Sequence, residues 1–257
     1  MKIEPKNLAD VFPIISYIVN QAGRYAFSCQ KGGFEVEFKD DMSPVTLVDR
    51  NTEELLRKMI REYFPGSGIL GEEFGEEKGE NGFRFILDPI DGTRSFIAGV
   101  PLWGTLLALE YEASPILGAM YVPTEDDVLI GAPGHGCKIG QRQLDIRDDR
   151  PIEKARAIIG DFKTTEEEGL GDFARRLTEK VYQIRGWGDC YGYYLLAAGK
   201  AEIMMDPYIE YYDVAAIRPI IESAGAVYSD LEGGRDFKVK NAIAAPPKLH
   251  EEVLKLL

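Results

Sequence analysis

The stretch Phe83–Gly104 constrains the fold more than any other part of the chain. It opens with an apolar run, Phe83–Leu87, which predicts a short buried strand, and continues with the acidic sequence DPIDGT. Because Pro89 has a fixed φ and restricts the residue before it, Asp88 is expected to be extended. The glycine that follows Asp91 permits a tight turn. We therefore expect two carboxylates to be held close together on a stiff loop at the end of a strand.

Two carboxylates at such a separation repel each other unless a cation lies between them. Since no thiol or imidazole is nearby, an all-oxygen cluster suits Mg²⁺ better than zinc. The same sequence also forms a good surface turn without any metal. The surrounding residues favour the metal site: Thr93 adds a hydroxyl, GEE at 71–73 adds an acidic pair, and Asp213 begins an apolar helical pattern.

Three segments carry a resemblance: GEE at 71–73, DPIDGT at 88–93 and YDVAA at 212–216. In this order and at these separations they look like the signature segments of the inositol monophosphatase superfamily. The resemblance extends from SPVTLVDR at 43–50 to SAGAVYSDLEG at 223–233, which is most of the chain. It implies a Mg²⁺-dependent, lithium-sensitive phosphomonoesterase. It also implies an α/β fold of the layered α+β kind, the α-β-α-β-α sandwich of sugar phosphatases, and a homodimer.

The resemblance assigns metal ligands to matching positions. It places a first Mg²⁺ on Glu72, Asp88 and the carbonyl of Ile90, and a second on Asp88, Asp91 and Asp213. Two or three ions per active site are implied. Such ions can neutralise the phosphoryl oxygens, position a water molecule and stabilise the departing alkoxide without a covalent intermediate.

The resemblance also implies catalytic and phosphate-binding roles. Thr93 and Glu72 are expected to orient the attacking water, and the backbone amides of Gly92 and Thr93 to bind the phosphate as a nest would. Asp49 resembles the family's acidic residue that supports the waters of the metal site. These assignments leave the catalytic work to carboxylates, one hydroxyl and backbone amides.

Two further positions bear on the metal site. The loop KDDMSPVT at 39–46 matches a family loop that helps to recruit an additional metal, which makes Asp40 and Asp41 acidic candidates; a solvated loop is the simpler interpretation. The family commonly has Trp before its last metal-binding Asp, whereas this chain has Tyr212. The wall of the site stays aromatic, but its shape is expected to differ.

The resemblance implies that the organic half of the substrate meets Trp187, Asp189 and Asp206. An extra carboxylate beside Asp206 favours a cationic ligand, because a desolvated ammonium gains most from a paired charge. Three segments together look most like the histidinol-phosphate phosphatase branch: GDCYGY at 188–193, SFIAGVPLWGTLLAL at 95–109 and SPVTLVDR at 43–50. The preferred hypothesis is therefore hydrolysis of L-histidinol phosphate to L-histidinol and phosphate, a step of histidine biosynthesis.

Several alternatives stay open. Asp189 is also well placed to cap a helix that begins at Cys190. The substrate alternatives are inositol 1-phosphate and fructose 1,6-bisphosphate, with adenosine bisphosphate weaker because no purine pocket is evident. A different class is a catalytically silent sensor of cations or phosphometabolites. Such a sensor has no need of the hydroxyl of Thr93.

Composition limits the class of partner and the compartment. The chain has 257 residues, 45% of them hydrophobic, so it can bury a large core. A formal net charge of −13 argues against nucleic acid as a partner, but a metal can still neutralise a small phosphorylated substrate. Three scattered cysteines suggest no disulfide framework. The polar first residues predict no signal peptide, and no apolar run reaches the ~18 residues that a membrane span needs. We expect a cytoplasmic protein that binds neither membranes nor nucleic acid.

The chain is predicted to form two halves. Residues 1–140 form an α+β half with most of the metal ligands, and residues 141–257 form an α/β half with a mixed sheet, the substrate contacts and one metal ligand. Asp49 is expected to be the N-cap of its helix, and 131–140 to be a turn-rich joint. The predicted helices span 11–27, 52–64, 166–180, 190–198, 214–224 and 249–257. The predicted strands span 34–38, 83–87, 105–111, 116–122, 127–130, 157–159, 181–184, 201–205 and 242–245.

Overall fold

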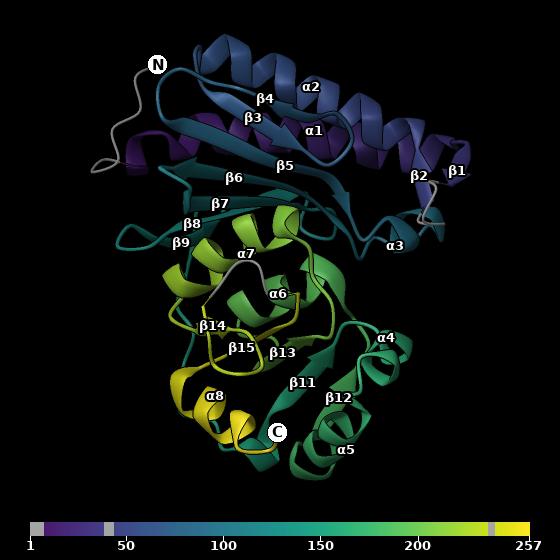
Figure 1. Cartoon of the computed structure of the whole chain (residues 1–257), viewed down its shortest axis with the longest axis vertical. Helices are drawn as coiled ribbons and strands as arrows, with labels where there is room; N and C mark the ends of the chain where they lie inside the picture. The colour runs from purple at the N-terminus through teal and green to yellow at the C-terminus, as the bar shows by residue number, and fades with distance from the viewer. Residues whose placement is uncertain (1–7, 39–43, 236–239) are drawn as a thin grey trace.

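The computed structural model describes residues 8–38, 44–235 and 240–257. From top to bottom, Figure 1 shows a helical layer, a sheet, a second helical layer, a second sheet and a third helical layer, which confirms the predicted α-β-α-β-α sandwich. The helices are α1 Phe12–Gly32, α2 Leu47–Tyr63, α3 Thr93–Ile97, α4 Phe162–Glu167, α5 Gly171–Lys180, α6 Asp189–Ala197, α7 Tyr211–Ser223 and α8 Pro247–Leu254, with 3-10 turns at Leu8–Asp10 and Ile152–Lys154. The strands are β1 Val36–Phe38, β2 Pro44–Thr46, β3 Gly68–Gly71, β4 Gly75–Glu77, β5 Phe83–Asp91, β6 Gly104–Tyr111, β7 Ser114–Val122, β8 Asp127–Ala132, β9 Gly136–Ile139, β10 Arg142–Leu144, β11 Arg156–Ile159, β12 Gln183–Arg185, β13 Ile203–Asp206, β14 Val227–Ser229 and β15 Ala242–Ala245.

The larger sheet has eight strands in the order β10-β9-β8-β7-β6-β5-β3-β4. Strands β5 to β10 form an antiparallel meander, and β3 pairs with β5 in parallel. Its side chains alternate between two cores: Phe85 and Leu87 join the core under α1 and α2, whereas Ile86 joins the core of α6 and α7. Both faces of the sheet are therefore covered by helices.

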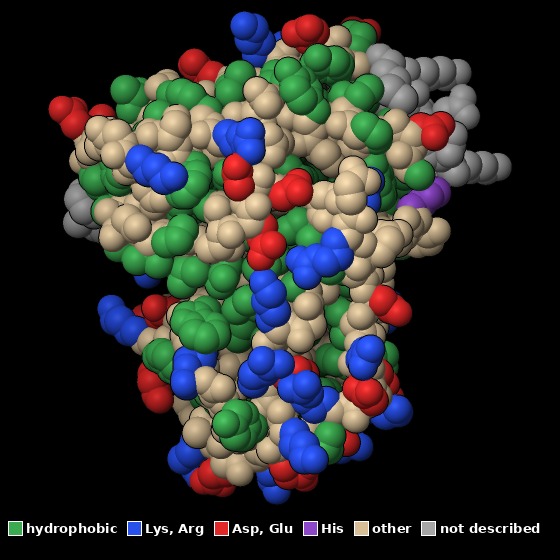
Figure 2. All heavy atoms as spheres, turned by 180° about the vertical axis from the view of Figure 1, so that it is seen from behind, with side chains coloured by type: hydrophobic (Ala, Val, Ile, Leu, Met, Phe, Trp, Pro, Cys, Tyr) green, Lys and Arg blue, Asp and Glu red, His purple; other side chains and the backbone are tan. Residues whose placement is uncertain are grey.

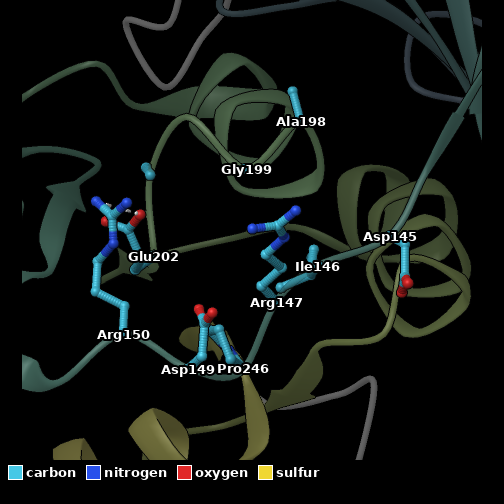
Figure 3. Close-up of a pocket in the computed structure, with 10 residues that line it drawn as sticks. Asp145, Ile146, Arg147, Asp149, Arg150, Ala198, Gly199, Glu202 and Pro246 are labelled. Atoms are coloured by element: carbon cyan, nitrogen blue, oxygen red, sulfur yellow. Dashed lines mark ion pairs between the residues drawn. The ribbon is translucent and has the colours of Figure 1, made fainter.

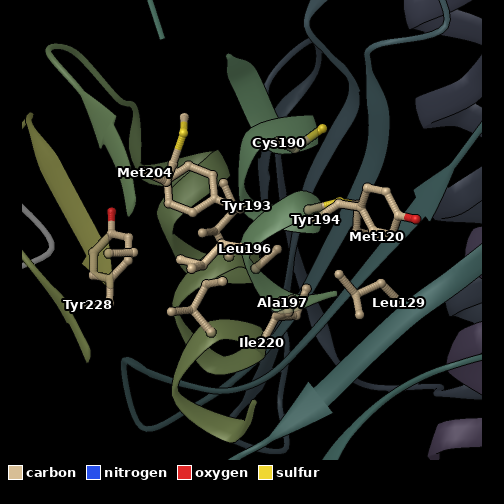
Figure 4. Close-up of a cluster of buried hydrophobic side chains, with 14 of the residues drawn as sticks. Met120, Leu129, Cys190, Tyr193, Tyr194, Leu196, Ala197, Met204, Ile220 and Tyr228 are labelled. Carbon is tan, nitrogen blue, oxygen red and sulfur yellow. The ribbon is translucent and has the colours of Figure 1, made fainter. Parts of the chain in front are cut away.

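The middle helical layer is buried between the two sheets. In Figure 4, Leu196 of α6 and Ile220 of α7 lie between Leu129 of β8 on one side and Met204 of β13 and Tyr228 of β14 on the other. A helix that packs on several sides needs apolar residues all round. This position explains the compact apolar sequence of α6.

The smaller sheet has five strands in the order β12-β11-β13-β15-β14. Strand β11 is parallel to β12 and β13, and β15 is antiparallel to β13 and β14, so the predicted mixed sheet is confirmed. Leu177 of α5 and Leu249 of α8 pack on its outer face. No helix in the described ranges has the length and apolar content to cross a membrane. The functional division near residue 140 stays a prediction.

The negative net charge is not spread evenly over the surface. Figure 2 shows Lys and Arg side chains gathered over the lower half of the face seen there, the half that carries the smaller sheet. Acidic side chains lie among them. Local recognition of charged groups is therefore set by individual clusters more than by the total of −13.

The start of α2 differs from the prediction. The helix begins at Leu47 with Thr46 as its N-cap, and Asp49 is the third helical residue, so the N-cap assignment of Asp49 is wrong. The Thr46 side chain accepts from the amides of Val48 and Asp49, and the Asp49 carboxylate accepts from the Thr46 amide in return. This capping box satisfies amides that would otherwise lack partners, which allows the helix to start earlier.

Two predicted boundaries are also wrong. The helix expected at 166–180 is broken into α4 and α5 because Gly169 adopts a left-handed φ of 72°. The expected turn-rich joint at 131–140 contains strand β9, which pairs with β8 and β10. Pairing with neighbouring strands has overridden the local preference of its glycines. Asp40 and Asp41 lie outside the described residues.

Candidate active site

A bulge at the end of β5 positions the two central carboxylates. The strand continues to Asp91, beyond the expected strand end, but its register with β6 shifts between Asp88 and Asp91. Pro89 lies in this bulge, where its missing amide costs no ladder hydrogen bond. The hydroxyl of the buried Thr105 on β6 donates to the carbonyl oxygen of Pro89 over 2.8 Å. The acidic loop is therefore an anchored part of the sheet.

Helix α7 brings a third carboxylate to the same place. Asp88, Asp91 and Asp213 each offer an oxygen, and these oxygens lie within 4.8 Å of one another. Asp213 Oδ2 accepts from the backbone amide of Glu210 over 3.1 Å, and Asp91 Oδ2 accepts from the amide of Cys190 over 2.7 Å. Backbone hydrogen bonds thus fix the direction of these carboxylates toward a common focus.

The electrostatics of the cluster fit a cation. Burial raises the pKa of Asp88 well above its usual range, and the charges of Glu72 and Asp213 raise it further. Burial and the Asp213 charge do the same to the pKa of Asp91, and burial raises the pKa of Asp213 to about 7. The donor atoms are all oxygens, the ligand type that Mg²⁺ prefers. A divalent ion at this focus would remove the repulsion between the carboxylates.

Glu72 follows β3 and is oriented by a residue that sequence analysis missed. The Glu72 amide donates to the Leu87 carbonyl over 3.2 Å, and the charge of Glu72 acts on Asp88. Glu53 of α2, fully buried, accepts from the amide of Glu73 over 2.8 Å and so holds the turn after β3. The sequence pattern that could have identified Glu53 is its position one helical turn before Leu56, on the apolar face of α2.

We predict that Glu53→Gln lowers the free energy of unfolding by about 2 kcal/mol. The carboxylate of Glu53 also pairs with Arg57, whose Nε lies 2.7 Å away and whose side chain is buried. The substitution therefore removes the nearer anion of a buried guanidinium and leaves Glu77, 3.7 Å away. Urea denaturation measures the change. Glu54→Gln, at an exposed neighbouring position, is the control and should leave stability unchanged. Equal stability of both variants would contradict the assigned role.

The predicted phosphate-binding turn begins a short helix. Gly92 has a left-handed φ of 88° and is the N-cap of α3, so the first amides of this helix lack intrahelical acceptors. The hydroxyl of Thr93 donates to the carbonyl oxygen of Ile90 over 3.0 Å. Asp49 is buried at the start of α2, and the charge of Glu72 contributes to raising its pKa after the larger effect of burial. Gly92 and Thr93 thus directly follow Asp91 of the carboxylate cluster, and Asp49 lies within electrostatic reach of Glu72.

A small acidic cavity adjoins the cluster. Its volume is about 40 Å³, and its lining includes Asp91, Asp189, Asp206 and Asp213. Burial raises the pKa of Asp206 well above its usual range, and the charge of Asp189 adds to this. Two of the predicted substrate contacts therefore meet beside the metal ligands. Trp187 is outside this lining, exposed next to Arg185, and its contact with substrate stays a prediction.

The capping alternative for Asp189 is wrong. Gly188 is the N-cap of α6, and Asp189 is the first helical residue, with a φ of 52°. The N-cap residue makes no side-chain hydrogen bond to the helix. Asp91 accepts the amide of Cys190 instead. Asp189 keeps solvent exposure, but partial desolvation by the surrounding protein raises its pKa to about 6, and the nearby charge of Arg94 opposes this rise. The Asp189 side chain is therefore available to a ligand.

A comparison with models of protein families shows to which family this chain belongs. A model of the inositol monophosphatase family matches residues 15–257. The chain belongs to the inositol monophosphatase family. It is therefore a phosphoric monoester hydrolase, as the three signature segments predicted.

Relatives within the inositol monophosphatase family carry different names. A histidinol-phosphatase from Chlorobaculum parvum is 38% identical over 199 residues, 77% of this chain and 77% of that protein. A fructose-1,6-bisphosphatase/inositol-1-monophosphatase from Aquifex aeolicus is 27% identical over 225 residues, 86% of this chain and 84% of that protein. Among solved structures, the extragenic suppressor protein suhB from Bartonella henselae has a TM-score of 0.89 at 26% identity, and the match covers 96% of this chain and 98% of that one. Family membership alone therefore does not identify the substrate of this chain.

Proposed function

We propose that this chain is a Mg²⁺-dependent phosphatase that hydrolyses L-histidinol phosphate to L-histidinol and phosphate. The observation that carries the proposal is the cavity in which Asp189 and Asp206 adjoin the metal-binding carboxylates. A substrate with an amine and a phosphate gains from carboxylates at one end and a metal site at the other. The 38% identity to a histidinol-phosphatase supports the same choice.

The metal ligands are those expected from the resemblance. Glu72, Asp88 and the Ile90 carbonyl would hold one ion, and Asp88, Asp91 and Asp213 the other. The second set is supported by oxygens within 4.8 Å of one another. When bound, Mg²⁺ supplies charge neutralisation at the phosphoryl oxygens and a more acidic water.

The residues around the ions position the substrate and the attacking water. The amides of Gly92 and Thr93, at the start of α3, would bind the phosphate oxygens. Thr93 would orient the water together with Glu72, and Asp49 would hold further waters of the site. Asp189 would pair with the substrate ammonium group. The reaction then needs no covalent intermediate on the protein.

A substrate comparison tests the proposal. Phosphate release is measured with Mg²⁺ from L-histidinol phosphate, myo-inositol 1-phosphate and fructose 1,6-bisphosphate under the same conditions. We expect the highest kcat/KM for L-histidinol phosphate. A higher value for either of the other two would reject this branch of the family. Absence of phosphate release from all three would instead favour the catalytically silent sensor.

We predict that Asp189→Ala raises KM for L-histidinol phosphate by about tenfold, because a charge-assisted hydrogen bond to the ammonium group is lost. The KM for myo-inositol 1-phosphate, which has no cationic group, should change much less. Asp172→Ala, an exposed position on α5, serves as the control. An equal change of KM for both substrates would remove the support for charge recognition. A cytoplasmic homodimer stays part of the proposal, to be checked by fractionation and by light scattering.

A further inference from the structure

A second, larger cavity lies apart from the carboxylate cluster. Its volume is about 420 Å³, which falls within the roughly 300–1,000 Å³ of small-molecule sites. It is bounded by residues 145–150, which link β10 to β11, by the turn between α6 and β13, and by Pro246 before α8. None of its lining residues lines the acidic cavity of the active site.

The linker that forms this cavity is held on both sides. The amide of Ile146 donates to the carbonyl of Ala224 at the end of α7 over 2.8 Å. Asp148 accepts from the backbone amide of Lys248 over 3.2 Å, and its carboxylate lies 3.6 Å from the Lys248 ammonium. The walls are therefore preorganised, which lowers the entropic cost of binding a ligand.

One wall of the cavity carries an ion-paired carboxylate. Glu202 is 6% exposed, and its carboxylate pairs with Arg150 over 3.1 Å and with Arg156 over 3.3 Å. The backbone amide of Arg156 also donates to it over 2.7 Å. Figure 3 marks the pair between Arg150 and Glu202 at one side of the cavity. These groups fix the wall and leave little charge of Glu202 for a ligand.

Two oppositely charged side chains of the cavity, Arg147 and Asp149, have no ion-pair partner among the described residues. In Figure 3, the Arg147 guanidinium rises from the linker toward the turn that carries Gly199, and the Asp149 carboxylate points up beside Pro246. Within the described part of the chain, neither Arg147 nor Asp149 has an ion pair or a side-chain hydrogen bond. Among the described residues, the cavity thus presents an unpaired guanidinium, Arg147, and unpaired carboxylates, Asp149 and Asp145.

We propose that this cavity binds a small zwitterion of the α-amino acid type. Arg147 would take the carboxylate through its planar fork, and Asp149 would take the ammonium group. A simple anion fits less well, because the carboxylates of Asp145 and Asp149 also line the cavity. A simple cation would face the uncompensated guanidinium of Arg147. This inference goes beyond the proposed hydrolysis and does not depend on it.

Calorimetric titration of the metal-free protein, in a buffer without phosphate or sulfate, tests the proposal. The probes are the standard L-amino acids, with acetate and methylammonium as ligands of one charge. We expect at least one amino acid to bind measurably tighter than either single-charge probe. Arg147→Gln and Asp149→Asn should each weaken that binding by at least about tenfold, since each removes a charge-assisted hydrogen bond.

Two control variants locate the site. Arg175→Gln removes an exposed guanidinium outside the cavity, and Asp88→Asn changes the carboxylate cluster; both should keep wild-type affinity for the amino acid. Thermal unfolding of each variant verifies that it is folded. The proposal is overturned if no amino acid binds, if acetate binds as tightly, or if Arg147→Gln retains the affinity. Loss of binding in Asp88→Asn would place the ligand in the active site instead.

Discussion

Replacing Asp88 with asparagine is expected to lower kcat/KM for phosphomonoester hydrolysis by about a thousandfold or more. Asp88 is the one side chain that both proposed ions share, and its oxygen lies within 4.8 Å of those of Asp91 and Asp213. Metal-ion catalysis contributes several kcal/mol of transition-state stabilisation, and each 1.36 kcal/mol is a factor of ten in rate. Initial rates of phosphate release with Mg²⁺ measure the loss.

Thermal unfolding of Asp88→Asn distinguishes a loss of metal binding from a loss of folding. Asparagine keeps the oxygen that accepts the Ile90 amide over 3.0 Å but removes one of several crowded negative charges. Without Mg²⁺, Asp88→Asn should therefore unfold at a higher temperature than the wild type. With Mg²⁺, only the wild type and the control Asp172→Asn should gain stability. A variant that stays active, or that loses stability without Mg²⁺, would contradict the assigned role of Asp88.

Local sequence was enough to find the centre of the site but not its geometry. The apolar run before Asp88 and the proline and glycine around Asp91 predicted a strand and a tight acidic turn, and both are present. The bulge could not be predicted, because it depends on the register of β5 against β6. Asp213 is far away in the chain, and the resemblance located it where residue spacing could not.

Several features that the sequence did not predict share a physical cause: they depend on contacts between segments distant in sequence. Glu53 acts on the turn at Glu73 because α2 packs beside β3 and β4. Asp189 is free of a capping role because Asp91 accepts the amide of Cys190 in its place. Arg147 and Asp149 line a cavity because the fold places their linker beside the turn after α6. Propensity and periodicity carry no information about such contacts.

The position of Asp213 depends on how closely α7 approaches the larger sheet. Gly118 of β7 lies directly against this helix: a Cβ atom at Gly118 would be 1.8 Å from the carbonyl oxygen of Ala216. This oxygen belongs to the backbone, so it cannot be relieved by a change of rotamer. The helix and the strand must separate if the glycine is replaced. Gly118 thus connects the packing of the core with the geometry of the carboxylate cluster.

Gly118→Ala is therefore expected to lower the free energy of unfolding by about 3 kcal/mol, or the melting temperature by roughly 6–12 °C for a chain of this size. Because α7 carries Asp213 in its first turn, the folded fraction should also bind Mg²⁺ more weakly. Thermal unfolding with and without Mg²⁺ measures both effects. Gly32→Ala adds the same methyl group where no atom lies within 4 Å, so it should leave both quantities unchanged. If Gly118→Ala behaved like Gly32→Ala, close packing of α7 could not be what holds Asp213 in place.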